Sequence, residues 1–257
     1  MALRARSVED YLAEKPNEPE WLIDGLLPRG GLTVVLAKPK TGKSILAAQV
    51  AGALGLGGMI LGRGVFERRR VLYVQLDAPD TDWKKQLRQT RLRGFDTIDF
   101  YDLPRFFLDS ESRRAELRAY IKAQGYDYVI WDALEKLTKA DLNTVPGMQI
   151  VMERLQSTFP GPRMLIHHPR KPSGDSVDNL VDAGSGSHYL SGEASAIWLL
   201  RKTAKLTGTL QLGGRYLDET WKLEREPETY LWVQARQQAP ESEDKYDWKK
   251  DHLRHSP

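Results

Sequence analysis

The chain has 257 residues, of which 40% are hydrophobic and 28% charged, and its formal net charge is +3. It contains no cysteine, which excludes a disulfide scaffold, a thiolate metal site and a cysteine nucleophile. No stretch approaches the roughly 18 consecutive apolar residues of a membrane span, and the first residues lack the apolar centre of a signal peptide, so we expect a cytoplasmic protein without a membrane partner.

Apolar runs alternate with helix-like stretches along the first two thirds of the chain. Strands are predicted at 32–37, 70–77, 98–103, 126–134 and 163–168, and helices at 8–13, 44–54, 82–94, 110–124 and 148–159. Apolar strands separated by helices are typical of a parallel sheet that is covered on both faces. The predicted fold class is therefore α/β.

The last third of the chain has a different pattern. Residues 169–187 are polar and rich in Gly and Ser. Short apolar runs with tight turns follow at 194–203, 207–216, 220–226 and 229–234, which predicts an antiparallel C-terminal extension of the sheet. We expect a polar lead-in at 1–20, one domain at 21–236 and a polar, disordered tail at 237–257.

A phosphate-binding loop is the clearest motif. Residues 37–44, AKPKTGKS, fit the pattern G-x-x-x-x-G-K-[ST] with alanine in the first position. An apolar run precedes the motif and a stretch without helix breakers follows it, as such a loop requires. The sequence therefore predicts a site for ATP and Mg²⁺. Its expected nucleotide contacts are Ala37, Lys38, Pro39, Lys40, Thr41, Gly42, Lys43, Ser44 and Ile45.

The residue types in the loop suit this chemistry. Loop amides and the N-terminus of the following helix point at phosphates. Lys43 is expected to reach the β- and γ-phosphates, and the Ser44 hydroxyl to bind Mg²⁺. Gly42 lets the backbone approach the phosphates closely.

Two aspartates that close apolar runs are candidates for the remaining chemistry. Asp132 ends the run YVIWD and is predicted to be a second metal-site residue, with a helix N-cap as the alternative. Asp77 ends VLYVQLD and is predicted to orient the attacking water, with a turn residue as the alternative. Asp80 and Asp82 lie nearby and are alternatives to Asp77 for this role, but we expect them to be helix caps.

His167 and His168 end another predicted strand, and strand alternation sends their side chains to opposite faces. Only one of them can easily sense a phosphate, and His168 is the candidate for the catalytic set. A packed histidine with satisfied hydrogen bonds is expected for the other.

Several segments together resemble the RecA-like P-loop ATPases of the plasmid RepA hexameric helicase type and their bacteriophage relatives. These segments are WLIDGLLPRGGLTVVLAKPKTGKS, VLYVQLD, VIWDAL and LIHHPRK…GSGSHYLSGEASAIWLL. The resemblance covers about residues 20–235 with the motifs in the expected order. It implies a RecA-like ATPase domain at 21–236, ATP hydrolysis, a homo-oligomeric ring or filament, and a bacterial or phage-infected host cell.

By position, the resemblance matches Lys43 and Ser44 to the phosphate-loop pair, Asp132 to the metal-site aspartate, and one of the two histidines to a γ-phosphate sensor. Asp77 stands where such ATPases usually have a catalytic glutamate, so its carboxylate sits about one methylene further back.

The resemblance also matches residues 169–187 to the mobile loop that binds nucleic acid in the central channel. Arg170 and Lys171 are therefore the candidate contacts to nucleic acid. No arginine stands near EASAIW, where the family's trans arginine finger tends to lie. The remaining candidates for that finger are Arg170, Arg201 and Arg215.

Three classes of function follow from these residues. The main prediction is an ATP-hydrolysing protein on single-stranded DNA, a helicase or recombination ATPase, with other replication or recombination proteins as candidate partners. The alternative is a non-motor regulator or loader that recruits another protein, which the modest net charge and the shortened Asp77 side chain favour. A small-metabolite kinase is a weaker third class, because no acceptor site or lid is identifiable.

Overall fold

The structure is a computed structural model of the chain, and it describes residues 5, 7–13, 20–92, 94, 97–101, 105–168, 187–215 and 217–235. The helices of the described part are α1 (Val8–Ala13), α2 (Lys43–Leu56), α3 (Asp80–Thr90), α4 (Glu111–Gln124), α5 (Val145–Thr158) and α6 (Ser187–Glu193). The strands of its main sheet are β3 (Leu32–Ala37), β6 (Val71–Gln75), β7 (Ile98–Tyr101), β8 (Tyr128–Asp132), β9 (Arg163–His167), β10 (Ala194–Lys202), β11 (Thr207–Gly214), β12 (Leu217–Arg225) and β13 (Trp232–Gln234).

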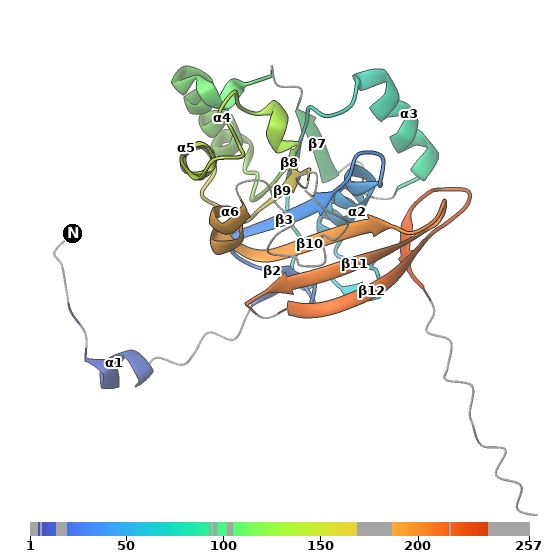
Figure 1. Cartoon of the computed structure of the whole chain (residues 1–257), viewed down its shortest axis with the longest axis horizontal. Helices are drawn as coiled ribbons and strands as arrows, with labels where there is room; N and C mark the ends of the chain where they lie inside the picture. The colour runs from blue at the N-terminus through green and yellow to red at the C-terminus, as the bar shows by residue number, and fades with distance from the viewer. Residues whose placement is uncertain are drawn as a thin grey trace, which may run out of the picture.

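The main sheet has nine strands in the order β13-β12-β11-β10-β3-β9-β8-β6-β7 (Figure 1). From β10 to β7 all neighbours pair in parallel. From β10 to β13 all neighbours pair antiparallel. The carboxyl ends of β3, β6, β8 and β9 therefore lie along one edge of the sheet, where open α/β sheets bind their ligands.

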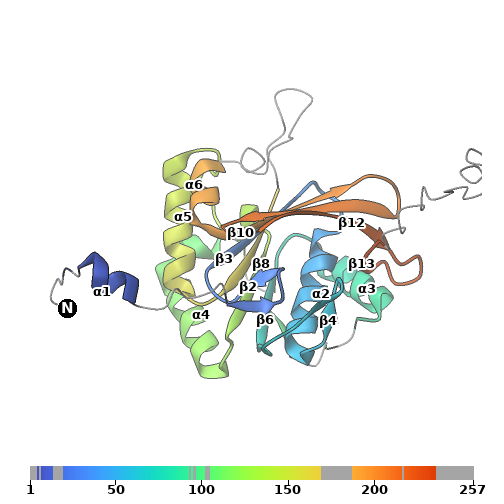
Figure 2. The ribbon, with the colours of Figure 1, turned by 90° about the horizontal axis from the view of Figure 1, so that it is seen from below.

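Helices cover both faces of the parallel part of the sheet (Figure 2). Alternate residues of β3 show this division, because Val35 and Ala37 belong to one buried cluster while Val34 and Leu36 belong to the other. The first cluster contains the buried side of α2 and Trp83 of α3. The second contains residues of α4, α5 and α6. Every residue of β3, β8 and β9 is buried, as expected for strands covered on both faces.

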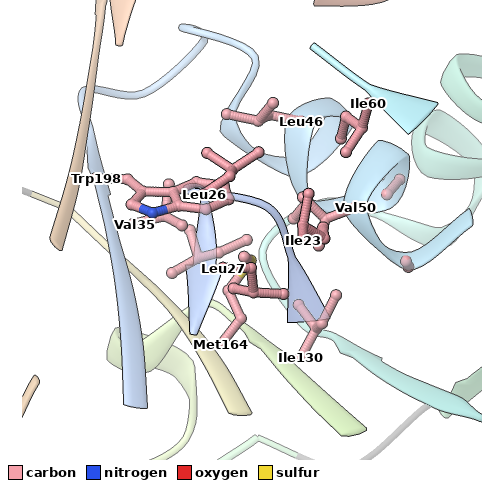
Figure 3. Packing of buried hydrophobic residues seen from close by; sticks show 14 of the residues in the cluster. Ile23, Leu26, Leu27, Val35, Leu46, Val50, Ile60, Ile130, Met164 and Trp198 are labelled. Carbon is pink, nitrogen blue, oxygen red and sulfur yellow. The ribbon is translucent and has the colours of Figure 1, made fainter. Parts of the chain in front are cut away.

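Two small hairpins that the sequence patterns did not predict add to this arrangement. One consists of β1 (Trp21–Ile23) and β2 (Leu27–Pro28), and the other of β4 (Met59–Ile60) and β5 (Arg63–Gly64). The first hairpin packs Ile23, Leu26 and Leu27 against the cluster that contains α2 and the sheet (Figure 3). The hairpin thereby adds buried side chains to the core on the α2 side of the sheet.

The predicted α/β class, the mostly parallel sheet and its antiparallel C-terminal extension are confirmed. The antiparallel part begins at β11, because β10 pairs in parallel with β3. The predicted tail at 237–257 lies outside the described residues. No helix of the described part is long and apolar enough to cross a membrane.

Some predicted boundaries were wrong for identifiable reasons. Helix α5 begins earlier than expected because Thr144 caps it, its side chain accepting a hydrogen bond from the Gly147 amide at 3.2 Å. Asp80 and Asp82 lie in the first turn of α3 and not at its cap, which is Pro79. Acidic residues in a first turn still interact favourably with the helix dipole. The polar segment ends sooner than predicted, because Ser187 already belongs to α6.

Trp198 offers a test of the core. Its side chain is fully buried beside Leu26 and Val35 (Figure 3), and its indole Nε1 has no hydrogen-bond partner among the described residues. Replacing it by alanine removes packing alone, and we expect the free energy of unfolding to fall by about 3–5 kcal/mol. Urea denaturation measures this, with the 65%-exposed Phe66→Ala as a control that changes it by less than about 0.5 kcal/mol. An equal effect of both substitutions would contradict the described core.

Candidate active site

The predicted phosphate-binding loop joins the end of β3 to the start of α2. Thr41 closes the loop, with its amide and its Oγ1 both donating to the Lys38 carbonyl, at 3.3 and 2.7 Å. Gly42 precedes the first helical residue with φ 100°, a left-handed conformation that favours glycine. A left-handed residue followed by a helix start gathers backbone N–H groups into a concave anion site. The loop thus has the backbone geometry for phosphate.

A pocket of about 550 Å³ opens beside this loop. Of the nine residues predicted to contact nucleotide, six line it: Pro39, Lys40, Gly42, Lys43, Ser44 and Ile45. The other three, Ala37, Lys38 and Thr41, do not line it. Two of the other predicted catalytic residues, Asp77 and His168, line it as well.

Lys43, Asp77 and His168 meet within this pocket. Lys43 Nζ lies 2.5 Å from Asp77 Oδ2, and its side chain is only 5% exposed. His168 Nε2 lies 3.8 Å from Asp77 Oδ1, while its Nδ1 lies 3.2 Å from the carbonyl oxygen of Ala37. Asp77 comes two residues after the last residue of β6, so it is a loop residue and not a strand end as the sequence predicted.

The charges of this group stabilise one another. His168 first, and then Lys43, hold the pKa of Asp77 well below its usual range although burial opposes them. Asp77 in turn raises the pKa of His168. A charged carboxylate therefore lies between the Lys43 ammonium group and the His168 imidazole, and a bound polyphosphate would compete with Asp77 for Lys43.

Asp132 lies at the end of β8 with a fully buried side chain. The Tyr73 hydroxyl donates to Asp132 Oδ2 at 2.8 Å, whereas Oδ1 is buried without a hydrogen-bond partner among the described residues. Burial raises the pKa of Asp132, and the positive charge of Lys43, followed by the hydroxyl groups of Ser44 and Tyr73, opposes that rise. The alternative that Asp132 caps the following short helix is wrong, since the cap position of Leu134–Lys136 is Ala133.

This arrangement suits Mg²⁺. A carboxylate oxygen without a partner, next to a serine hydroxyl at the phosphate loop, is the kind of oxygen donor set that a hydrated Mg²⁺ ion uses together with substrate phosphates. Ser44 and Asp132 are the residues that would hold the ion or its waters. The ion would neutralise charge on the phosphates during phosphoryl transfer.

His167 has a different environment from His168. It is 2% exposed, and its Nδ1 lies 2.6 Å from Glu135 Oε1. The same carboxylate oxygen accepts the backbone amide of His168 at 2.7 Å. Burial favours the neutral form of Glu135, but hydrogen bonds from His167 and from that amide lower its pKa. Glu135 thus fixes the backbone from which His168 reaches the pocket, and no pattern in the sequence had indicated it.

Residues distant in sequence complete the pocket wall. They come from α3 and the turn before it, and from β12 and the turn after it: Ala78, Pro79, Trp83, Gln86, Gln89, Thr90, Arg225, Thr229 and Tyr230. Of the arginine-finger candidates, Arg201 lies on β10 and Arg215 follows β11, and neither lines this pocket. Arg170, like Lys171, lies outside the described residues. The identity of the finger stays a prediction.

The Asp77–His168 pair makes a pH dependence predictable. Because the pKa of His168 is raised in the folded chain, the pair stabilises the fold fully below about pH 6.5, the pKa of an unfolded histidine. That contribution is lost as pH rises through the raised pKa, whereas Asp77 stays ionised throughout this window. We expect His168→Asn to lower the free energy of unfolding more at about pH 5.5 than at about pH 8.5 in urea titrations.

The control for this prediction is Asp77→Asn, which removes the carboxylate partner. In that background the effect of His168→Asn is expected to depend less on pH over the same range, because Asp77 is the largest cause of the raised pKa of His168. A cost of His168→Asn that is equal at both pH values in the unmodified background would show that the pair is not formed in solution.

Comparisons with known proteins agree with this architecture. The sequence profile of the AAA domain family matches residues 1–174. No curated protein matches the chain. Among solved structures, a DnaB-like replicative helicase, described with its interactions with primase, superposes with a TM-score of 0.63 at 13% identity, covering 89% of this chain and 67% of that one.

A KaiC-like protein from the hyperthermophilic archaeon Pyrococcus horikoshii OT3 superposes with a TM-score of 0.52 at 15% identity, covering 84% of this chain and 94% of that one. At these identities the two structures show a shared fold. Together with the family match over most of the sequence, they lead to one assignment. The chain belongs to the AAA domain family and has a RecA-like P-loop fold.

Proposed function

We propose that this protein hydrolyses ATP with Mg²⁺ and acts on single-stranded DNA in replication or recombination. The observation that carries ATP hydrolysis is the convergence of Lys43, Asp77 and His168 in one pocket at the carboxyl ends of the parallel strands. The Asp132 carboxylate is buried beside Ser44 with one oxygen free of hydrogen bonds among the described residues, and these two residues are the proposed metal site.

In the proposed reaction, residues of this chain bind the phosphates of ATP, orient the attacking water and exclude other water. The loop amides and Lys43 bind the β- and γ-phosphates. Asp77 orients the attacking water and accepts its proton. His168, which reaches Asp77 and the Ala37 carbonyl, senses the γ-phosphate.

The role on DNA rests on the sequence of Arg170 and Lys171, which directly follow His168 and Pro169. A cationic pair this close to the residue that senses the γ-phosphate would couple DNA contact to nucleotide state. The DnaB-like protein that shares the fold is a replicative helicase, which favours replication over the other DNA processes. We further propose that the chain acts as a homo-oligomeric ring or filament.

The first test is the ATPase rate with and without single-stranded DNA, alongside a mass measurement with a non-hydrolysable nucleotide. We expect DNA to stimulate hydrolysis and nucleotide to favour a homo-oligomer. The double substitution Arg170→Ala/Lys171→Ala should weaken DNA binding. It should also reduce the slope of the logarithm of the binding constant against the logarithm of the salt concentration by about 1.4, since two phosphate contacts are lost. Lys84→Ala/Lys85→Ala removes the same charge from α3 and serves as the control.

A specific observation also favours the second candidate, a non-motor ATP-dependent regulator or loader. Asp77 is shorter than the glutamate usual in the resembled family, and it holds Lys43 in an ion pair of 2.5 Å. Both features slow turnover, which suits a switch. Hydrolysis that is unaffected by DNA, with unchanged DNA affinity and salt slope in the Arg170/Lys171 variant, would favour this regulator over the DNA-acting ATPase.

A further inference from the structure

The C-terminal end of the sheet touches the phosphate-binding loop directly. On β12, Arg225 donates from Nη2 to the Thr41 carbonyl oxygen at 2.5 Å. On β13, Trp232 donates from its indole Nε1 to the Gly42 carbonyl oxygen at 3.2 Å. These contacts join residues that are more than 180 positions apart in sequence, and Figure 2 shows β13 beside α2.

The contact is anchored on both sides. Gln49 of α2 donates to the Trp232 carbonyl oxygen and accepts from its amide, both at 2.9 Å. The Arg225 guanidinium lies 4.5 Å from the centre of the Trp232 ring, a cation–π arrangement. Trp232 is 1% exposed. We name Arg225, Trp232 and Gln49 the loop brace.

The steric fit between the loop brace and the loop is close. A Cβ atom added to Gly42 would lie 1.4 Å from Arg225 Nη2 and 3.1 Å from Trp232 Nε1. Any side chain at this position would therefore displace the guanidinium. The left-handed φ of 100° favours glycine here, and any other residue would also have to move the Arg225 guanidinium away from the Thr41 carbonyl.

The loop brace donates hydrogen bonds to two carbonyl groups whose directions are linked to those of the loop amides. In a trans peptide the C=O and the next N–H point in opposite directions. A donor that holds the Thr41 carbonyl thus orients the Gly42 amide, and one that holds the Gly42 carbonyl orients the Lys43 amide. The Gly42 carbonyl also accepts the first helical bond, from the Leu46 amide at 3.1 Å, so its direction follows α2.

Among the described residues, no carboxylate lies within 4 Å of the charged Arg225 guanidinium. Its bonds go to a carbonyl and an aromatic ring, and it lines the same pocket as Lys43. Burial lowers its pKa, but an arginine stays protonated at physiological pH. The brace therefore adds positive charge to the wall of the phosphate pocket.

We infer that Arg225 and Trp232 are positioning residues of the nucleotide site, which hold the Thr41 and Gly42 peptides so that the loop amides are ready for the phosphates before nucleotide arrives. This inference rests on the proposed function for its kinetic consequence only. Its structural consequence, a loop held by the brace in the free protein, can be measured without any nucleotide.

The experiment uses the full-length chain and its Arg225→Ala, Arg225→Lys and Trp232→Phe variants. Lys222→Ala is the control, since it removes an exposed cation from the same strand. Hydrogen–deuterium exchange of the free protein is followed in peptides that cover residues 37–45. We expect exchange about tenfold faster in the three variants than in the wild-type and control proteins, because each loses the guanidinium or indole group whose contacts order the loop.

Arg225→Lys separates positioning from charge. Lysine keeps the positive charge but lacks the planar guanidinium that bonds Thr41 and stacks on Trp232. We expect it to behave like Arg225→Ala. Full restoration of wild-type exchange by lysine, or unchanged exchange in Arg225→Ala and Trp232→Phe, would overturn the inference whether or not the protein hydrolyses ATP.

ATPase kinetics add a second readout. We expect the KM for ATP to rise about tenfold in Arg225→Ala and Trp232→Phe, with kcat within about threefold of wild type, because ground-state phosphate binding is what the loop loses. An effect confined to kcat would place Arg225 at the reacting phosphate and overturn the positioning role. A wild-type protein without ATPase activity but with the expected exchange pattern would refute the proposed function and leave the brace established.

Discussion

Replacing Lys43 by alanine is expected to lower the ATP hydrolysis rate by about a thousandfold. The ammonium group lies at the start of α2, buried except for 5% of its side chain, and is held 2.5 Å from Asp77 in the free protein. In the proposed reaction it moves its interaction from this carboxylate to the β- and γ-phosphates, whose charge it stabilises during transfer. Steady-state phosphate release measures the loss.

The matched control is Lys122→Ala, which removes an exposed lysine from the last turn of α4. Its rate is expected to stay within about twofold of wild type, since surface substitutions away from the site have small effects. Near wild-type hydrolysis by the Lys43→Ala protein would mean that the loop at 37–45 is not the site of phosphoryl transfer.

Replacing Asp77 by asparagine is expected to separate binding from turnover. The amide keeps the size of the side chain but cannot accept the proton of the attacking water, so kcat should fall by about a hundredfold or more. Binding of ATP with Mg²⁺ should be retained, because the substitution also releases Lys43 from its ion pair. Single-turnover hydrolysis and a fluorescent-nucleotide titration measure the two effects separately.

Asp132→Asn is the contrasting variant. Its carboxylate is buried beside Ser44 with one oxygen unpartnered, so its loss should weaken the Mg²⁺-dependent part of nucleotide binding. Asp77→Glu is informative as well, since a carboxylate one methylene longer is expected to speed a slow enzyme. Equal turnover of Asp77→Asn and wild type would move the water-orienting role to another residue, with Asp80 and Asp82 the nearest carboxylates in sequence.

Much of the site was predictable because it follows a local pattern. The motif at 37–44 specifies a strand, a loop and a helix start within eight residues, and the structure has β3, the loop and α2 there. Asp132 follows an apolar run whose residues are all buried, so its place at the sheet edge was predictable too. Strand alternation separated the environments of His167 and His168, and the structure places only His168 in the pocket wall.

Other parts of the site had no such pattern. In the sequence, Glu135 looked like a charged residue of a short helical run. In the structure its carboxylate accepts a hydrogen bond from the His168 amide and also contacts Nδ1 of His167, the last residue of β9. Arg225 and Trp232 looked like parts of an ordinary C-terminal strand pair. Their partners are backbone carbonyl groups, which every residue has, so no residue type in the loop indicates that such a contact exists.

The sequence by itself determined the α/β class, the main alternation of strands and helices from β3 to β9, and the phosphate-binding loop, because hydrophobic periodicity and a contiguous motif depend on neighbours along the chain. The tertiary structure alone decided that Asp77 pairs with Lys43, that Glu135 supports His168, and that β12 and β13 close over Thr41 and Gly42. These contacts depend on strand order and on the path of each turn. Both are set by packing between segments that are remote in sequence, and no local pattern records them.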